Sequence, residues 1–237
     1  MSGMSRLILL ICGAAALAVG DEEEQIAALH AINTVRLEHG LNSLDQDRIL
    51  AATAENFAAD LAARGALSHR DSSGGTALDR YRRLGGTAFR VGEILGAGED
   101  LAPIVDRWIE SDSHHAVLTS SAWTHAGIGV KRRGKIFVFV ALFARLRFAD
   151  LRIKSQKAHL IIEGRLIGAG GRPVLQAGGA DHQPVWWRPD TGALRFVVPA
   201  GQVGYFGRLG VREEDGTFTV TDIVILAVAS RQVLNPE

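Results

Sequence analysis

Residues 108–130 of this chain read WIESDSHHAVLTSSAWTHAGIGV, and they contain the change from helical to strand spacing that decides the fold. The stretch opens at the end of a predicted helix, residues 101–111, for which Asp100 is the expected N-cap. Ser113 is placed to cap a further helical turn. Apolar residues then recur with period two in residues 125–131, HAGIGVK, which indicates a strand.

A second apolar strand, residues 135–144 (KIFVFVALFA), follows a turn at Arg132-Arg133-Gly134, so the pair is predicted to be a β-hairpin. Upstream, the spacing predicts helices, a loop rich in Ser and Gly, and a loop or short strand. The helices are predicted at residues 22–39, 45–65 and 76–84. The loop rich in Ser and Gly is predicted at residues 68–75, and the loop or short strand at residues 89–98. Helices followed by an antiparallel hairpin predict an α+β fold with helices packed on a sheet.

The chain after the hairpin differs in character. Residues 148–156 are more charged and are predicted to be a linker, and residues 157–237 read as a small all-β, sandwich-like domain. Its expected strands are residues 159–167, 194–199, 204–210 and 217–229. Asp181-His182 and Trp186-Trp187-Arg188 stand out within it. Adjacent strand residues point to opposite faces, so one Trp is expected in the core and the other at the surface.

The first twenty residues resemble a secretory signal peptide. Arg6 precedes an apolar run of twelve residues, 7–18, and the small residues Ala18 and Gly20 suit cleavage after Gly20. The run is shorter than the roughly 20 apolar residues of a transmembrane helix, so no integral span is expected once it is removed. An uncleaved anchor is the alternative. The predicted location is secreted or periplasmic.

The amino-acid composition limits the classes of function that this chain can have. Cys12 is the only cysteine, so a processed chain would have neither disulfides nor thiol chemistry. The 237 residues are 47% hydrophobic, enough for a sizeable core, and 26 Lys and Arg balance 26 Asp and Glu. That balance argues against a nucleic-acid partner bound through bulk charge.

Three ionisable residues lie in segments suited to a site: His69 in the loop after the second helix, Glu93 beside Gly92, and His114. Imidazole and carboxylate groups suit a divalent ion such as zinc, and they equally suit acid–base chemistry. The spacings of 24 and 21 residues match no short metal motif, so capping roles stay open. No Gly-x-Ser-x-Gly elbow supports a serine hydrolase.

The order of the motifs is more specific than any one of them. Asn33 and Arg36, Gly40-Leu41, Ser68-His69, Gly92-Glu93, Trp108-x-x-Ser-x-x-His114 and Gly127-Ile-Gly-Val follow in turn. This succession resembles the CAP superfamily, also called SCP or cysteine-rich secretory domains, in its bacterial cysteine-free branch. The thirteen residues from His114 to Gly127 match the family spacing. The resemblance covers residues 25–145 and places a CAP-like domain at residues 21–147.

The resemblance implies a three-layer α-β-α sandwich with a large cleft. His69, Glu93 and His114 match three of the four residues that bind a divalent metal in several members. Ser111 stands where many members carry the fourth, acidic ligand, so water would complete the shell of a weakly bound ion such as zinc. Ile94 replaces the usual Asn after the glutamate, and His115 is expected at the rim of the cleft.

Three functions follow from the resemblance. The first is an exported envelope module that binds a ligand or divalent metal in a His/Glu cleft without catalysis, its partner being an envelope ligand, a lipid or a polymer. The second is a metal-dependent hydrolase, acting on peptides or cell wall, with Glu93 as general base on a metal-bound water. The third is a carrier of lipids or sterols. Function depends on the site rather than on the fold, so the three stay open.

Overall fold

The structure, a computed structural model, describes residues 4–168, 170–202 and 206–226, with side chains from Asp21 onward except those of residues 202 and 225. It divides into two compact units, Met1–Gly86 with Arg90–Arg145 and Thr87–Phe89 with Leu146–Glu237. The predicted signal peptide, residues 1–20, lies outside the described side chains and stays a prediction. No helix in the part of the chain searched is long and apolar enough to cross a membrane.

The first unit is built on a four-stranded sheet with the order β1-β3-β4-β2. The hairpin predicted from the sequence is confirmed, because β3 (His125–Arg133) and β4 (Ile136–Ala144) pair antiparallel. The segment left open as loop or strand is β2 (Val91–Gly98), which pairs antiparallel with the other side of β4. The two-residue strand β1 (Asp45–Gln46) adds to β3 in parallel.

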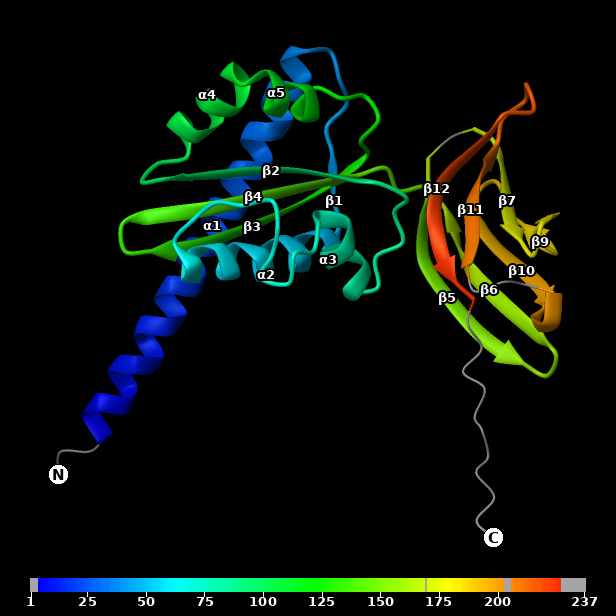
Figure 1. Cartoon of the computed structure of the whole chain (residues 1–237), viewed down its shortest axis with the longest axis horizontal. Helices are drawn as coiled ribbons and strands as arrows, with labels where there is room; N and C mark the ends of the chain where they lie inside the picture. Colours follow the sequence, from blue (N-terminus) through cyan, green and yellow to red (C-terminus); the bar gives the residue numbers. More distant parts are fainter. Residues whose placement is uncertain (1–3, 169, 203–205, 227–237) are drawn as a thin grey trace, which may run out of the picture. The chain divides into compact units, whose positions relative to one another are not determined.

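Helices cover both faces of this sheet (Figure 1). One face carries α2 (Arg48–Arg64) and α3 (Ala77–Arg83). The other carries α1 (Met4–Glu38), α4 (Ala102–Glu110) and α5 (Asp112–Leu118). This unit therefore has mixed helices and sheet in three layers.

The glycines of β3 explain how closely α2 packs. A Cβ added at Gly127 would lie 2.1 Å from the backbone nitrogen of Ala51, and one at Gly129 would lie 2.1 Å from the carbonyl carbon of Ala54. Any larger residue would collide with the helix backbone, which cannot move aside as a side chain can. The Gly-Ile-Gly pattern is thus a requirement of helix-on-sheet packing.

The opposite face holds the larger core cluster. Trp108 on α4 is 2% exposed, and its indole Nε1 donates to the backbone oxygen of Leu95 on β2, 2.7 Å away. Around it pack fully buried side chains from three helices and the sheet: Ile32, Ile104, Leu118, Ile128 and Phe139. Burial of this many apolar side chains supplies the main stabilising free energy of the unit.

Three predicted helix caps are wrong. Asp45 was expected to start the second helix, but it pairs with His125 in β1, so the helix begins later and Asp47 is the N-cap. Its carboxylate accepts from the backbone nitrogen of Leu50 at 2.8 Å. Asp100 does not cap α4 either, since the N-cap position is Leu101 and makes no side-chain bond. Ser113 lies inside α5, whose N-cap is Ser111.

The second unit is a pair of four-stranded sheets over a shared core. One sheet has the order β5-β6-β10-β9 and the other β12-β11-β7-β8. The first consists of β5 (Phe148–Gln156), β6 (His159–Leu166), β10 (Ala193–Pro199) and β9 (Trp186–Trp187). The second consists of β12 (Phe218–Ile225), β11 (Phe206–Arg212), β7 (Arg172–Ala177) and β8 (Ala180–His182), and a short 3-10 helix, Ala200–Gln202, follows β10.

The linker predicted at residues 148–156 is instead strand β5 of this unit. Most of its side chains are exposed, which explains its charged composition, but its backbone is paired with β6 along its length. A short segment between α3 and β2 also belongs to the second unit. There Ala88 bridges Asp222, and Phe89 donates its backbone N–H to Thr221.

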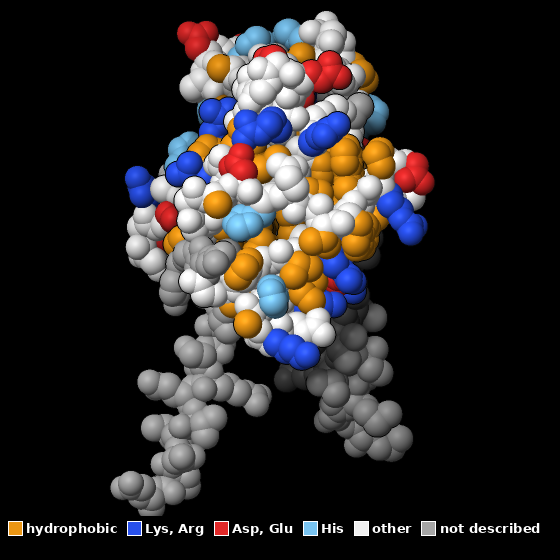
Figure 2. Space-filling model, turned by 90° about the vertical axis from the view of Figure 1, so that its right-hand side faces the viewer, with side chains coloured by type: hydrophobic (Ala, Val, Ile, Leu, Met, Phe, Trp, Pro, Cys, Tyr) orange, Lys and Arg blue, Asp and Glu red, His pale blue; other side chains and the backbone are white. Residues whose placement is uncertain are grey.

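The two adjacent tryptophans divide as the alternation of a strand predicts. Trp186 is 41% exposed, whereas Trp187 packs against the core of the second unit. The guanidinium of Arg195 lies 5.7 Å from the centre of the Trp186 ring. Figure 2 shows that hydrophobic side chains on the face it presents lie between Lys and Arg side chains rather than in one continuous sheet of apolar surface.

Candidate functional site

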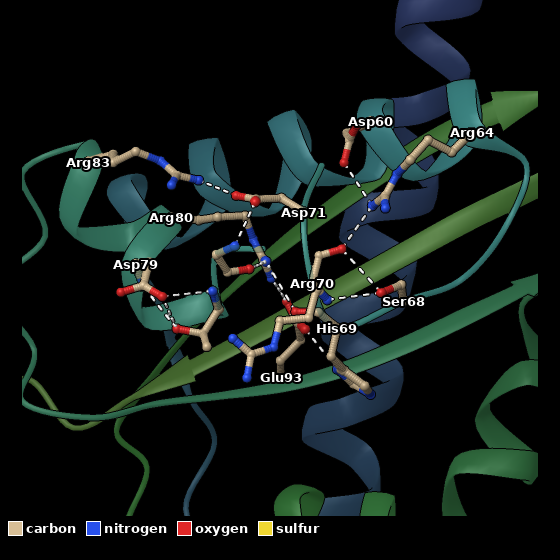
Figure 3. Close-up of polar contacts among 12 residues, drawn as sticks. Asp60, Arg64, Ser68, His69, Arg70, Asp71, Asp79, Arg80, Arg83 and Glu93 are labelled. Atoms are coloured by element: carbon tan, nitrogen blue, oxygen red, sulfur yellow. Dashed lines mark hydrogen bonds and ion pairs between the residues drawn. The ribbon is translucent and has the colours of Figure 1, made fainter. Parts of the chain in front are cut away.

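His69 and Glu93, separated by 24 residues in the sequence, are in direct contact (Figure 3). The imidazole Nδ1 of His69 lies 2.8 Å from Oε1 of Glu93. The Glu93 side chain is 5% exposed, whereas that of His69 is 60% exposed. A carboxylate only accepts hydrogen bonds, so Nδ1 carries the proton, and in the neutral ring Nε2 is left as a free acceptor.

Arg80 of α3 binds the other carboxylate oxygen of Glu93, and its side chain is 7% exposed. One guanidinium nitrogen, Nη1, also donates to the backbone oxygens of His69 and Gly75, at 3.3 and 3.0 Å. The guanidinium stacks over Phe57 of α2, 3.4 Å from the ring centre. Arg80 therefore holds the carboxylate and the His69 loop against α2 together.

The sequence interpretation missed Arg80, although a signal was present. Ala77, Arg80 and Tyr81 are spaced three and four residues apart, so they share one face of α3, and all three are buried. An arginine on an otherwise apolar helix face needs a buried partner. Nothing in the sequence identifies Glu93 as that partner.

Asp71 organises the loop that presents His69. Its Oδ1 accepts from the backbone nitrogens of Ser73 and Gly75, at 2.9 and 2.8 Å, and Oδ2 binds the Arg83 side chain. The hydrogen bond from Gly75 and the one from Arg83 hold the pKa of the Asp71 carboxyl below its ordinary value. This SHRDSSGG loop is therefore an ordered turn built on one charged carboxylate.

His114 lies on α5, and its ring nitrogen Nδ1 is buried without a hydrogen-bond partner among the described residues. Burial lowers the pKa of His114, and the neighbouring His69 lowers it further by charge repulsion. The imidazole is therefore held neutral, the form in which histidine acts as a ligand or acceptor. His115 is half-buried beside it.

Arg36, on α1, holds the end of α5 in position. Its guanidinium is buried, and Nη1 donates to the backbone oxygens of Leu118 and Ser120, 2.8 and 2.9 Å away. Nε donates to the oxygen of Asn42 at 3.1 Å. Two of these three carbonyl groups, those of Leu118 and Ser120, lie at the end of the helix that carries His114, so the arginine of the N-terminal motif has a structural role.

The predicted set of three metal ligands does not fit a preformed three-ligand centre. Both oxygens of Glu93 are already bound, one by His69 and one by the cationic Arg80. The described residues contain no group of three His, Cys, Asp or Glu side chains placed to hold a metal ion. Glu93 instead fixes the orientation of the His69 ring. The imidazoles of His69 and His114 are the groups left to face a cation.

The model of the cysteine-rich secretory protein family, CAP, matches residues 29–143, which hold the whole of this site. The N-terminal unit is a CAP domain. It contains no cysteine after Cys12, as in the cysteine-free branch that the sequence resembles.

The CAP domain is similar to proteins of several bacteria. An uncharacterized membrane protein of Bacillus subtilis, YlbC, is 31% identical over 112 residues, which are 47% of this chain and 32% of that protein. An uncharacterized protein of Borreliella burgdorferi is 26% identical over 132 residues, 55% of this chain and 84% of that protein. The matched region thus spans only about a third of the Bacillus relative.

Two solved structures are also similar to this chain. An extracellular protein containing an SCP domain from Bacillus anthracis has a TM-score of 0.49 at 23% identity, over 53% of this chain and 41% of that one. An outer surface protein from Borrelia burgdorferi has a TM-score of 0.48 at 26% identity, over 51% of this chain and 91% of that one.

Proposed function

We propose that this protein is an exported module of the bacterial cell envelope whose CAP domain binds a ligand through His69 and His114 without catalysing a reaction on it. The observation that carries the proposal is the state of Glu93. Its carboxylate is buried and bound on both oxygens, so its role is to orient His69. Export is supported by the apolar run at residues 7–18 and by the match to a family that is described as secretory.

The ligand class that suits the imidazoles of His69 and His114 is a divalent cation such as zinc. Imidazole is a favoured zinc ligand, and a ligating histidine usually donates its other N–H to a carboxylate, as His69 does to Glu93. With two protein ligands, water would complete the coordination shell and binding would be weak. Zinc binding by the His69 ring is compatible with the hydrogen bond to Glu93 and does not require Glu93 to be a ligand.

The hydrolase alternative has less support. A general base must reach the proton it removes and must have a free acceptor oxygen. Each oxygen of Glu93 is already bound, one by Arg80 and one by His69, and the side chain is only 5% exposed, so Glu93 is poorly placed to take a proton from a water. The hydroxyl of Ser68 is bonded to the backbone of Arg70, so it does not face His69 as a nucleophile would.

Lipid carriage also has less support. The described groove with the most apolar character lies along α1 and has a volume of about 420 Å³. Six of its nine lining residues are nevertheless polar, and only three are apolar. The lining consists of Gln25, Ile26, Leu29, His30, Asn33, Thr34, Leu37, Ser43 and Gln46. Such a mixed, shallow groove does not resemble the mostly apolar pockets that enclose lipids.

The test is a calorimetric zinc titration of the full chain, purified without a histidine tag. We expect the His69→Ala/His114→Ala double variant to bind one zinc ion fewer than the wild type. Glu93→Gln, which keeps the shape but weakens the orientation of His69, should lower the affinity of that ion by about tenfold or more. Equal zinc binding by wild type and double variant would contradict the metal proposal.

Catalysis is tested separately. The full chain is incubated with casein and with purified peptidoglycan, with zinc and with a chelator. We expect no turnover in either condition. Chelator-sensitive turnover that the double variant lacks would overturn the non-catalytic part of the proposal while leaving metal binding intact.

A further inference from the structure

A second pair of histidines lies apart from the His69–Glu93 contact. His39 follows the end of α1, and His115 lies on α5, which packs beside that end of α1 (Figure 1). Their Nε2 atoms are 3.3 Å apart, and the ring centres are 5.1 Å apart at an interplanar angle of 67°. His39 is exposed and His115 half-buried, so water and ions reach both.

The tautomer of His39 is determined by its other nitrogen. Nδ1 lies 2.8 Å from the backbone oxygen of Val35, and a carbonyl oxygen only accepts. Nδ1 of His39 is therefore the donor, and the neutral ring presents the lone pair of Nε2 toward His115. Donation to a backbone carbonyl is the usual second-sphere arrangement of a metal-bound histidine.

The separation of the rings matches a shared ion. Two imidazoles on one tetrahedral zinc, with Zn–N bonds near 2.0–2.1 Å, have nitrogens about 3.3–3.4 Å apart and ring centres about 5.2 Å apart. A straight hydrogen bond of the same length would put the ring centres about 5.6 Å apart. The observed 3.3 and 5.1 Å agree with lone pairs that converge on one point.

The local field also favours a cation. His39 adjoins the last turn of α1, where the aligned peptide dipoles of the helix leave a partial negative charge. Imidazole pairs suit zinc, nickel and copper among the divalent ions. The described residues provide no third His, Cys, Asp or Glu ligand at this place, so water would fill the remaining positions.

We propose that His39 and His115 form a second, two-histidine site for a divalent first-row metal ion, distinct from the pair of His69 and His114. The site joins the end of α1 to α5. It does not depend on the proposed function, because it uses different histidines.

The test is a zinc titration of the untagged full chain in the His69→Ala/His114→Ala background, which removes the first proposed ion from the count. We expect one zinc ion to remain bound, and we expect added His39→Gln or His115→Gln to abolish that binding. His30→Gln, which replaces an exposed histidine on the same helix, should leave it unchanged. Binding that survives both His39→Gln and His115→Gln, or a background that binds no zinc, would overturn the proposal.

A second measurement uses the wild-type chain and does not rely on any variant folding. Substoichiometric Cu²⁺ is added while the histidine ring signals are followed by nuclear magnetic resonance. The ring signals of His39 and His115 should broaden at a lower copper ratio than those of His30. Broadening of these two rings no earlier than His30 would contradict the site.

Discussion

Arg80 and Glu93 form a buried ion pair in which the two side chains are 7% and 5% exposed, and this pair supports the exposed His69. Glu93 points toward α2 and α3, the helices on that face of the sheet, and Arg80 of α3 binds its carboxylate there (Figure 3). The pair thus links the packing of α3 on β2 to the orientation of the site histidine.

Removing the arginine should destabilise the CAP domain strongly. Arg80→Met leaves the Glu93 carboxylate buried without its cation, and breaking a buried pair in this way costs about 3–5 kcal/mol of the free energy of unfolding. Urea unfolding followed by circular dichroism measures the effect. Arg64→Met is the matched control, because Arg64 pairs with Asp60 on the surface of the neighbouring helix, with both side chains 31% exposed. Its cost should stay below about 1 kcal/mol, and equal losses in the two variants would refute the role assigned to Arg80.

Close packing of α2 on β3 makes Gly129 intolerant of a side chain. Gly129→Ala places a Cβ 2.1 Å from the carbonyl carbon of Ala54, so helix and sheet must separate. We expect a loss of about 3 kcal/mol or more in the free energy of unfolding, at the upper end of overpacking effects. Gly98→Ala serves as the control, since its Cβ would meet only side-chain atoms, those of Ile104 at 3.3 Å and Arg107 at 3.5 Å. A thermal unfolding midpoint unchanged by Gly129→Ala would be inconsistent with the close approach.

Replacing Arg36 with lysine should destabilise the fold even though the positive charge is kept. A single ammonium group lacks the fork of donors that reaches Leu118, Ser120 and Asn42, so buried carbonyls lose their partners. Each unsatisfied buried acceptor costs about 1–3 kcal/mol, and we expect about 2–3 kcal/mol in all for Arg36→Lys. Arg107→Lys is the comparison, because Arg107 makes one exposed bond to Ala97. Similar unfolding free energies for the two variants would argue against the capping role.

Acid should weaken the fold through His125. Burial lowers the pKa of this histidine, against an opposing effect of Asp45 and Asp47. Below the ordinary pKa of about 6.5, the unfolded chain takes up a proton that the folded chain resists, so stability is lost as the pH falls toward the lowered pKa. One such group contributes a slope of at most about 1.4 kcal/mol per pH unit.

The check is the free energy of unfolding measured between pH 7 and pH 5 for wild type and His125→Gln. The variant should lose less stability on acidification over this window. We attribute some of the pH dependence that remains in the variant to His114, whose pKa is also lowered by burial. A variant with the same pH dependence as the wild type would show that His125 is not buried in the neutral form.

By itself the sequence determined the elements whose signal is local. Period-two spacing in residues 125–144 specified the hairpin, and helical spacing specified the helices, because each pattern reflects one face turned to the core. The order of the motifs also indicated the CAP domain, which the family match at residues 29–143 confirms, whereas the candidate metal ligands stay a prediction. Local signals were weaker at the element ends, where Asp45 and Asp47 are equally good caps and only pairing with β3 decides between them.

Tertiary structure alone decided the pairings between distant residues. Glu93 was a plausible metal ligand until folding brought Arg80 to its second oxygen, and no local pattern encodes a contact across 13 residues of loop and helix. His39 and His115 meet across 76 residues for the same reason. A strand with many charged side chains, such as β5, has the composition of a linker, because backbone pairing with a neighbouring strand does not depend on which side chains are present. Partner choice is a property of the packed fold, and the sequence supplies only the residues that are available for it.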